Sequence, residues 1–394
     1  MCVCVCVCVC VCVCVCVCHY QCCGTTCPAS PHWSRYSNTL VLHHKAEKLF
    51  ILYCFGASLI IGVTQASRGD SSNEYTGCYH VCHFNNCSSK VGIAAYESSQ
   101  SLSEKFFQWT CDDECKYYCM WRTTQIFIDK GMDVPQFFGK WPFARVWGMQ
   151  EPAAVLFSVF NLLAHAVSLI QFRQTVPSNA PLYKIWFLHA VICINAWVWS
   201  VVFHARDTPW TERLDYFCAF SMVLFSLFGL LVRMSGPRQE FVKEASAVMG
   251  LVFFTYHVWY LTKGRFDYGY NMMVNVIVGV LNGFGWIAWA VPRLKTRPYV
   301  WWCVFTVIGA MASMLLELGD FPPLFWALDA HALWHLATAP LPFMWYRDFF
   351  MEYHVSVISL CVCVCVLDFW RVIACTYYKE NQDQTIRSRF KKVL

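Results

Sequence analysis

Residues 185–232 read IWFLHAVICINAWVWSVVFHARDTPWTERLDYFCAFSMVLFSLFGLLV, in which two apolar runs flank a short polar stretch. Each apolar run is long enough, as a helix, to cross the ~30 Å hydrocarbon core of a bilayer. The polar stretch begins at Ser200 and ends at Asp215. Polar and ionisable residues beside such runs are costly in lipid, so they are candidates for function.

The whole chain has the composition of a membrane protein. It contains 394 residues, of which 57% are hydrophobic and only 14% are charged, whereas a soluble domain carries about a quarter charged residues. A soluble protein with a large core would not explain apolar runs that recur along the chain. The net charge of +5 is small and scattered, so no nucleic-acid partner is expected.

Two low-complexity tracts inflate the count of 26 cysteines. Residues 2–18 alternate Cys and Val, and CVCVCV returns at residues 361–366. A (TG)n nucleotide repeat encodes this strict alternation in one frame. Residues 1–45 are therefore predicted to be a translated repeat or a mispredicted upstream segment. The alternative is a β-prone strand, which would be an aggregation hazard.

Residues 46–66 are predicted to be a signal peptide. Basic residues at Lys45 and Lys48 accompany the start of a short apolar run, LFILYCFGASLIIGV, at residues 49–63. Small residues then occupy the −3 and −1 positions of a cleavage site, at Thr64 and Ala66. Because the run is short for a membrane span, a signal anchor is only the alternative.

Residues 67–150 are predicted to form a cysteine-rich helical domain in the lumen of the secretory pathway. An even number of cysteines after a signal peptide indicates disulfides. The spacing is C-x3-C-x4-C and then C-x3-C-x3-C, which places cysteines on one face of each of two helices. The six are Cys78, Cys82, Cys87, Cys111, Cys115 and Cys119.

Two helices joined as an antiparallel hairpin would satisfy this spacing. We expect nested pairing among the fifteen possible connectivities: Cys78 with Cys119, Cys82 with Cys115, and Cys87 with Cys111. A zinc site is the alternative. Asn86 opens the sequence Asn86-Cys87-Ser88 and is a predicted N-glycosylation site, with which a disulfide at Cys87 would compete.

The fold is predicted to be all-α, a seven-transmembrane helix bundle within residues 151–346 that follows the N-terminal disulfide-stapled domain. With that domain in the lumen, the predicted cytosolic loops hold eight basic residues and the lumenal loops four. This asymmetry agrees with the positive-inside rule. The predicted spans are 152–172, 185–203, 215–232, 245–262, 271–291, 299–318 and 324–346.

This topology brings five dispersed polar residues to the lumenal side of the membrane. Ser200 and His204 end the second span, and Asp215 opens the third. His331 and His335 lie two to three turns into the seventh span. Residues four apart share one face of a helix, so each pair can point into a common pocket.

Three histidines from two helices match a catalytic zinc (Zn2+) arrangement that leaves one position for water. Bound zinc lowers the pKa of water to about 7. Asp215 could accept a proton, and Ser200 could donate a hydrogen bond to a developing oxyanion. One alternative is a polar network that joins helices without metal. Another is Ser200 as a nucleophile, but no G-x-S-x-G sequence surrounds it.

Four motifs closely resemble the Per-like family, and the resemblance extends over residues 67–342. They are GKWPFARVWGMQEPA, NAWVWSVVFHARDTPWTERLDYFCA, RFDYGYN and DFPPLFWALDAHALWH. The family belongs to the CREST superfamily of seven-span membrane hydrolases, together with alkaline ceramidases and adiponectin-type receptors. Its pattern S-x3-H, Asp, H-x3-H is matched by Ser200, His204, Asp215, His331 and His335. By resemblance, the three histidines hold zinc, and Ser200 and Asp215 serve catalysis.

The resemblance implies lipid remodelling of GPI-anchored proteins in the Golgi membrane. The sn-2 acyl chain of the anchor's phosphatidylinositol would be removed by a phospholipase A2-type hydrolysis. A ceramidase-like amide hydrolase and a non-enzymatic receptor or chaperone for GPI proteins remain alternatives. The cysteine-rich domain favours GPI-anchor remodelling over a ceramidase activity, since the ceramidase branch generally lacks this domain.

The chain departs from the family after residue 342. Residues 347–394 are predicted to be an atypical cytosolic tail that ends in KKVL. Lys391 and Lys392 resemble a dilysine retrieval signal, which would return the protein to the endoplasmic reticulum. The alternative is a basic end without a sorting role.

Overall fold

The computed structural model describes residues 68–236, 239–317 and 319–347. Within these ranges the chain is helical and contains only three isolated β-bridges, all at tight turns. The predicted all-α class is confirmed. The predicted repeat and signal peptide, and the tail from residue 348 onward, lie outside the described residues.

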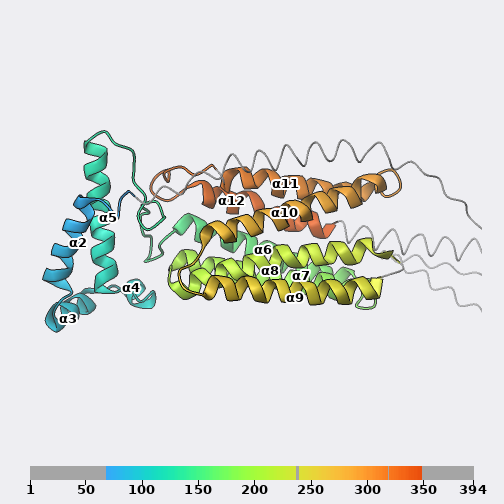
Figure 1. The fold of residues 1–394 in the computed structure, drawn as a ribbon, viewed down its shortest axis with the longest axis horizontal. Helices are drawn as coiled ribbons and strands as arrows, with labels where there is room; N and C mark the ends of the chain where they lie inside the picture. The colour runs from blue at the N-terminus through green and yellow to red at the C-terminus, as the bar shows by residue number, and fades with distance from the viewer. Residues whose placement is uncertain (1–67, 237–238, 318, 348–394) are drawn as a thin grey trace, which may run out of the picture. The chain divides into compact units, whose positions relative to one another are not determined.

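The N-terminal domain, residues 68–150, is built on two helices, α2 (Asn73–Asn86) and α5 (Cys111–Asp129). Two shorter helices connect them, α3 (Lys90–Ser99) and α4 (Leu102–Phe106), as Figure 1 shows. Local sequence fixes where α5 begins. The Thr110 side chain accepts from the Asp113 backbone N–H, and the Asp113 side chain accepts from the Thr110 backbone N–H. This capping box satisfies two helix-end donors.

Three disulfides join α2 to α5 in an antiparallel arrangement. They are Cys78–Cys119, Cys82–Cys115 and Cys87–Cys111, each with a Cα–Cα distance of 5.7 Å. These are the nested pairs among the connectivities that the spacing left open. A small domain buries too little apolar surface to be stable on its core alone, so the cross-links supply what its core lacks.

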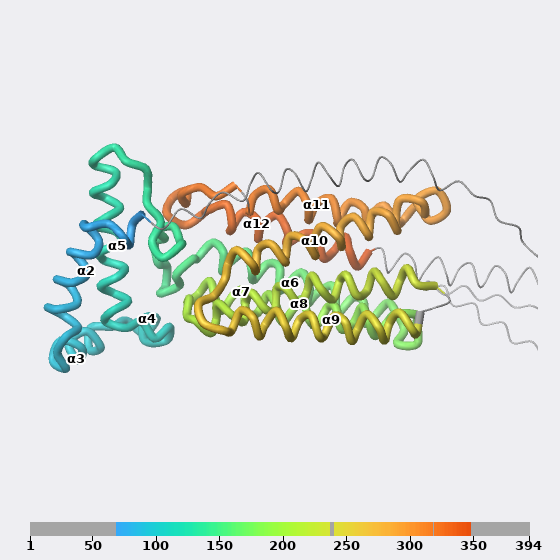
Figure 2. The backbone as a smooth tube through the Cα atoms, in the orientation of Figure 1, coloured from blue at the N-terminus to red at the C-terminus, as the bar shows by residue number. Residues whose placement is uncertain are grey.

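Six long helices follow, and Figure 2 traces the path of the chain through them. Within the described residues, six segments are long and apolar enough to cross a membrane. Many large apolar side chains on them remain exposed, as a lipid-facing surface requires. The chain is therefore a multi-pass membrane protein. The helices are α6 (Pro152–Thr175), α7 (Tyr183–Ala205), α8 (Pro209–Met234), α9 (Gln239–Thr262), α10 (Tyr268–Ala290) and α11 (Trp301–Glu317).

The seventh predicted span, 324–346, is not confirmed. A tight turn at Leu324–Leu328 precedes α12 (Ala330–Thr338), whose nine residues span about 14 Å at ~1.5 Å per residue. A turn at residues 339–340 interrupts the helix, which resumes from 341 to the end of the described residues at 347. Pro340 and Pro342 explain the break, because proline lacks the N–H that a helix interior needs.

The packing of the bundle separates an apolar end from a polar end. Helix α6 packs against α7 and α12, α8 against α7, α9 and α10, and α11 against α10 and α12. A large apolar core gathers residues near the end of α6, the start of α7 and the end of α10, including Phe172, Trp186 and Trp286. The opposite end of α7 carries two of the polar residues predicted from the sequence, Ser200 and His204.

Removing one disulfide should loosen the N-terminal domain. We expect Cys78→Ser with Cys119→Ser to destabilise that domain by roughly 2–4 kcal/mol, because the unfolded chain gains freedom. Hydrogen-exchange mass spectrometry should then show faster exchange in α2 and α5. Cys193→Ser, which replaces a buried free cysteine of α7, is the matched control. Unchanged exchange in both helices of the double variant would contradict the structural role.

Candidate metal centre

Three histidines converge at the polar end of the bundle. His204 is the penultimate residue of α7, and His331 and His335 lie one turn apart on α12. The Nε2 atoms are separated by 2.9 Å for His331 and His335, 3.2 Å for His204 and His335, and 3.3 Å for His204 and His331. Among the described residues, this is the group of at least three donors that could hold a metal ion.

Two carboxylates fix the orientation of two of these rings. The Nδ1 atom of His204 lies 2.6 Å from Glu151 Oε2, and the Nδ1 atom of His331 lies 2.6 Å from Glu317 Oε2. A carboxylate at Nδ1 holds the proton there and leaves a lone pair on Nε2. Facing lone pairs about 3 Å apart would repel one another unless a cation lay between them. The donor set therefore fits a metal ion.

Glu151 is tied to the end of α7 through its backbone as well. It is the last residue before α6, which begins at Pro152. Its backbone N–H donates to the carbonyl of His204 at 3.0 Å, and that of Gln150 donates to the carbonyl of Ala205 at 3.0 Å. The start of α6 and the end of α7 are thus fastened together where the histidines lie.

A lysine balances the charge of Glu151. Lys140 Nζ lies 2.6 Å from Glu151 Oε1 and 2.9 Å from Asp207 Oδ2. Burial alone would lower the pKa of Lys140, but the two carboxylates outweigh it and raise the pKa. Burial would raise the pKa of Glu151, but Lys140 and His204 lower it. Both groups are therefore charged at neutral pH.

The third histidine is placed by a different set of contacts. The Asn161 side chain of α6 donates to the His335 carbonyl at 2.6 Å, and the Thr338 hydroxyl donates to the same carbonyl at 3.0 Å. The His335 ring lies edge-on to the ring of Trp197, with centroids 5.2 Å apart. Helix α12 is thereby anchored to α6 and α7, even though it is short.

Ser200 and Asp215, the other two predicted residues, lie at the same end of the bundle. Ser200 is one turn before His204 on α7 and is buried, with its Oγ 3.1 Å from the Oγ of Ser158. Asp215 lies on α8, and its carboxylate interacts electrostatically with His204 and His331. The five sequence-predicted residues thus reach one region of the structure from three helices.

Several residues of this region were not predicted as part of it. Glu151 directly precedes the predicted span 152–172, and Glu317 lies at the end of the predicted span 299–318, both on the side of His204. This position is the one signal that could have found them. Ser158 and Asn161 lie inside an apolar run, where an isolated polar residue forms no pattern. Lys140 lies in a loop far from the histidines in the sequence.

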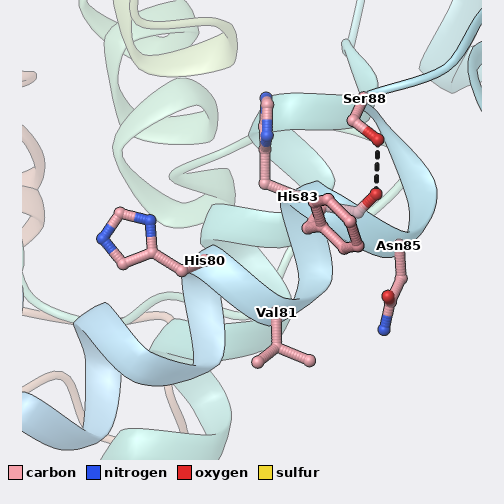
Figure 3. A pocket seen from close by; sticks show the side chains of 6 residues that line it. His80, Val81, His83, Asn85 and Ser88 are labelled. Atoms are coloured by element: carbon pink, nitrogen blue, oxygen red, sulfur yellow. Dashed lines mark hydrogen bonds between the residues drawn. The ribbon is translucent and has the colours of Figure 1, made fainter.

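The surface of α2 offers no comparable donor set. Figure 3 shows a hollow there whose lining includes two histidines, and the large apolar side chains beside them are exposed. Two imidazoles alone do not make a site of at least three ligands. The residues that line the hollow are His80, Val81, His83, Phe84, Asn85 and Ser88.

Comparison with known proteins places these motifs in one family. The model of the Per1-like family matches residues 101–353. GPI-specific phospholipase A2-like PGAP3 of Xenopus tropicalis is 43% identical over 287 residues, which cover 73% of this chain and 90% of the relative. Post-GPI attachment to proteins factor 3 of Drosophila melanogaster is 43% identical over 304 residues, or 76% of this chain and 93% of the relative. GPI-specific phospholipase A2-like PGAP3 of Homo sapiens is 43% identical over 279 residues, or 71% and 87%.

Substituting any one of the three histidines should remove bound metal. We expect His335→Ala to lower the metal content of the purified protein from about one ion per chain to near zero, because two imidazoles hold an ion far more weakly than three. Elemental analysis by mass spectrometry measures this. His165→Ala is the matched control, since His165 is a buried histidine of α6 outside the cluster. Equal metal content in the two variants would rule out the site.

Proposed function

The chain belongs to the Per1-like family, and from this premise we propose that it hydrolyses GPI-anchor lipid. The reaction is removal of the sn-2 acyl chain from the phosphatidylinositol of GPI-anchored proteins. The observation that carries the proposal is the convergence of three histidine Nε2 atoms at one end of a membrane bundle. The names of the relatives, which include a GPI-specific phospholipase A2-like protein, support the substrate.

Zinc is the metal that we propose for the three histidines. In tetrahedral zinc sites, Zn–N distances of 2.0–2.1 Å separate neighbouring nitrogens by about 3.3 Å. The observed separations of 2.9, 3.2 and 3.3 Å are close to that value. When bound, zinc supplies an activated water at neutral pH. An all-imidazole set suits zinc better than magnesium or calcium, which prefer oxygen ligands.

Ser200 and Asp215 would act on the ester directly. Asp215, which interacts with His204 and His331, would accept the proton of the attacking water and return it to the leaving glycerol oxygen. The Ser200 hydroxyl would donate to the ester carbonyl oxygen as negative charge develops on it. Because the Ser158 hydroxyl can donate to Ser200 Oγ, the Ser200 proton stays available for the substrate.

The depth of the site suits an ester at the membrane surface. The polar residues lie at helix ends, where the glycerol esters of a phospholipid meet water, and the acyl chains can remain among the exposed apolar side chains. We propose that this end faces the Golgi lumen, an oxidising compartment in which the three disulfides persist. Asn86 is exposed at the end of α2, but the Cys87–Cys111 disulfide beside it would compete with a glycan there.

The function is tested in knockout cells that lack the activity and are rescued with this chain. Wild type should restore saturated sn-2 chains on GPI anchors, measured by lipid mass spectrometry. Ser200→Ala should lower the rate on the order of 10²–10³-fold, because it removes a donor to the oxyanion. Ser168→Ala, at a buried serine of α6 away from the histidines, should rescue normally.

The same cells and the purified protein separate the alternatives. His331→Ala should fail to remodel anchors at normal protein abundance; full remodelling by this variant would end the metal-dependent mechanism. Release of fatty acid from ceramide, with none from GPI lipid, would show an amide hydrolase instead. Rescue that survives the loss of all three histidines would indicate a receptor or chaperone.

A further inference from the structure

A line of ion pairs and hydrogen bonds links the N-terminal domain to the candidate metal centre. It runs from Lys140 through Glu151 to His204, with contacts of 2.6 Å at each step. We propose that Lys140 is a positioning residue, which orients the Glu151 carboxylate so that His204 presents its Nε2 atom to the metal. This inference rests on the metal centre of the proposed function and adds a residue that acts on it from outside.

A tight turn positions Lys140 beside Glu151. Phe137 and Lys140 exchange both backbone hydrogen bonds, with N–O distances of 2.7 and 2.9 Å. The two residues between them, Phe138 and Gly139, have φ values of 50° and 82°. Such a turn needs positive φ at both central positions, and glycine adopts it without steric cost. The backbone therefore fixes where the lysine side chain starts.

The two oxygens of Glu151 have separate partners. Lys140 Nζ contacts Oε1, and His204 Nδ1 contacts Oε2. The ammonium group is itself held by Asp207 at 2.9 Å and by the face of the Phe203 ring, whose centroid is 4.2 Å away. With Oε1 occupied, the carboxylate cannot rotate away from His204 without breaking an ion pair.

The orientation of Glu151 by Lys140 is distinct from the packing of α6 against α7, which backbone hydrogen bonds maintain. The backbone N–H groups of Gln150 and Glu151 join the start of α6 to the end of α7 through bonds in which Lys140 takes no part. Lys140 thus orients the Glu151 carboxylate and balances its negative charge. The packing of α6 against α7 does not depend on Lys140. The other carboxylate, Glu317, has no lysine or arginine within ion-pair distance in the described ranges, so the lysine acts on the His204 ligand alone.

Zinc affinity of the purified full-length protein tests the inference, measured by competition with a chromophoric chelator. Lys140→Met should bind zinc about tenfold more weakly, the lower range for partners of metal ligands. Lys140→Arg keeps the charge and should restore most of the affinity. Lys130→Met is the matched control, because Lys130 pairs with Glu74 at the same kind of distance, 2.7 Å, on the N-terminal domain.

A double-mutant cycle shows whether Lys140 acts through Glu151. In a Glu151→Gln background, adding Lys140→Met should change zinc affinity less than twofold, since the ion pair is already lost. If the double variant instead lost zinc affinity by the product of the two single losses, the inference would be overturned. Lys140 would then act independently of Glu151. Wild-type affinity for Lys140→Met would overturn it as well.

Two further readouts guard against misleading outcomes. Glu151→Gln breaks the same ion pair from the other side and should weaken zinc binding by about as much as Lys140→Met; wild-type affinity for Glu151→Gln alone would overturn the route through Glu151, even if Lys140→Met failed to fold. Release of fatty acid is measured separately. A protein that binds zinc in a Lys140-dependent way and releases no acyl chain would support the positioning role and reject the proposed hydrolase.

Discussion

The mutual approach of three imidazole nitrogens is the constraint on which the rest of the structure depends. Their Nε2 atoms lie 2.9 to 3.3 Å apart, an arrangement that a cation between them would stabilise. Carboxylates on the far side of two of the rings help to hold this arrangement. Glu151 and Glu317 serve two of the rings, and contacts from α6 and α7 hold the third. The start of α6, the ends of α7 and α11, and the short helix α12 must therefore meet at one place.

Much of the fold follows from sequence periodicity. Cysteines four residues apart place thiols on one helix face, so the antiparallel pair of α2 and α5 could be expected, whereas α3 and α4 gave no comparable signal. Apolar runs located the six long helices. The seventh predicted span is not confirmed. Its apolar composition extends across the turn at residues 339–340, where Pro340 interrupts the helix.

The site was only partly predictable, for a physical reason. Two pairs of residues four apart, Ser200 with His204 and His331 with His335, each share one helix face. The alternating direction of the spans assigns both pairs and Asp215 to one end of the bundle. Charged residues at span boundaries are common, so Glu151 and Glu317 could not be told from ordinary interfacial carboxylates before their partners were known. Lys140 is recognised only from its contacts, since its link to His204 passes through a third residue.

The backbone bonds between the start of α6 and the end of α7 also limit how the bundle can move. Two helices fastened at one end cannot slide along each other without breaking those bonds. A lipid that enters sideways must part helices somewhere, and the parting has to occur away from this pair. Helix α9 packs mainly against α8 and borders the bundle, so fewer helix-to-helix contacts hold it in place than hold the other long helices. The end of α6 and α7 that holds His204 would then stay rigid while the opposite wall of the bundle opens to lipid.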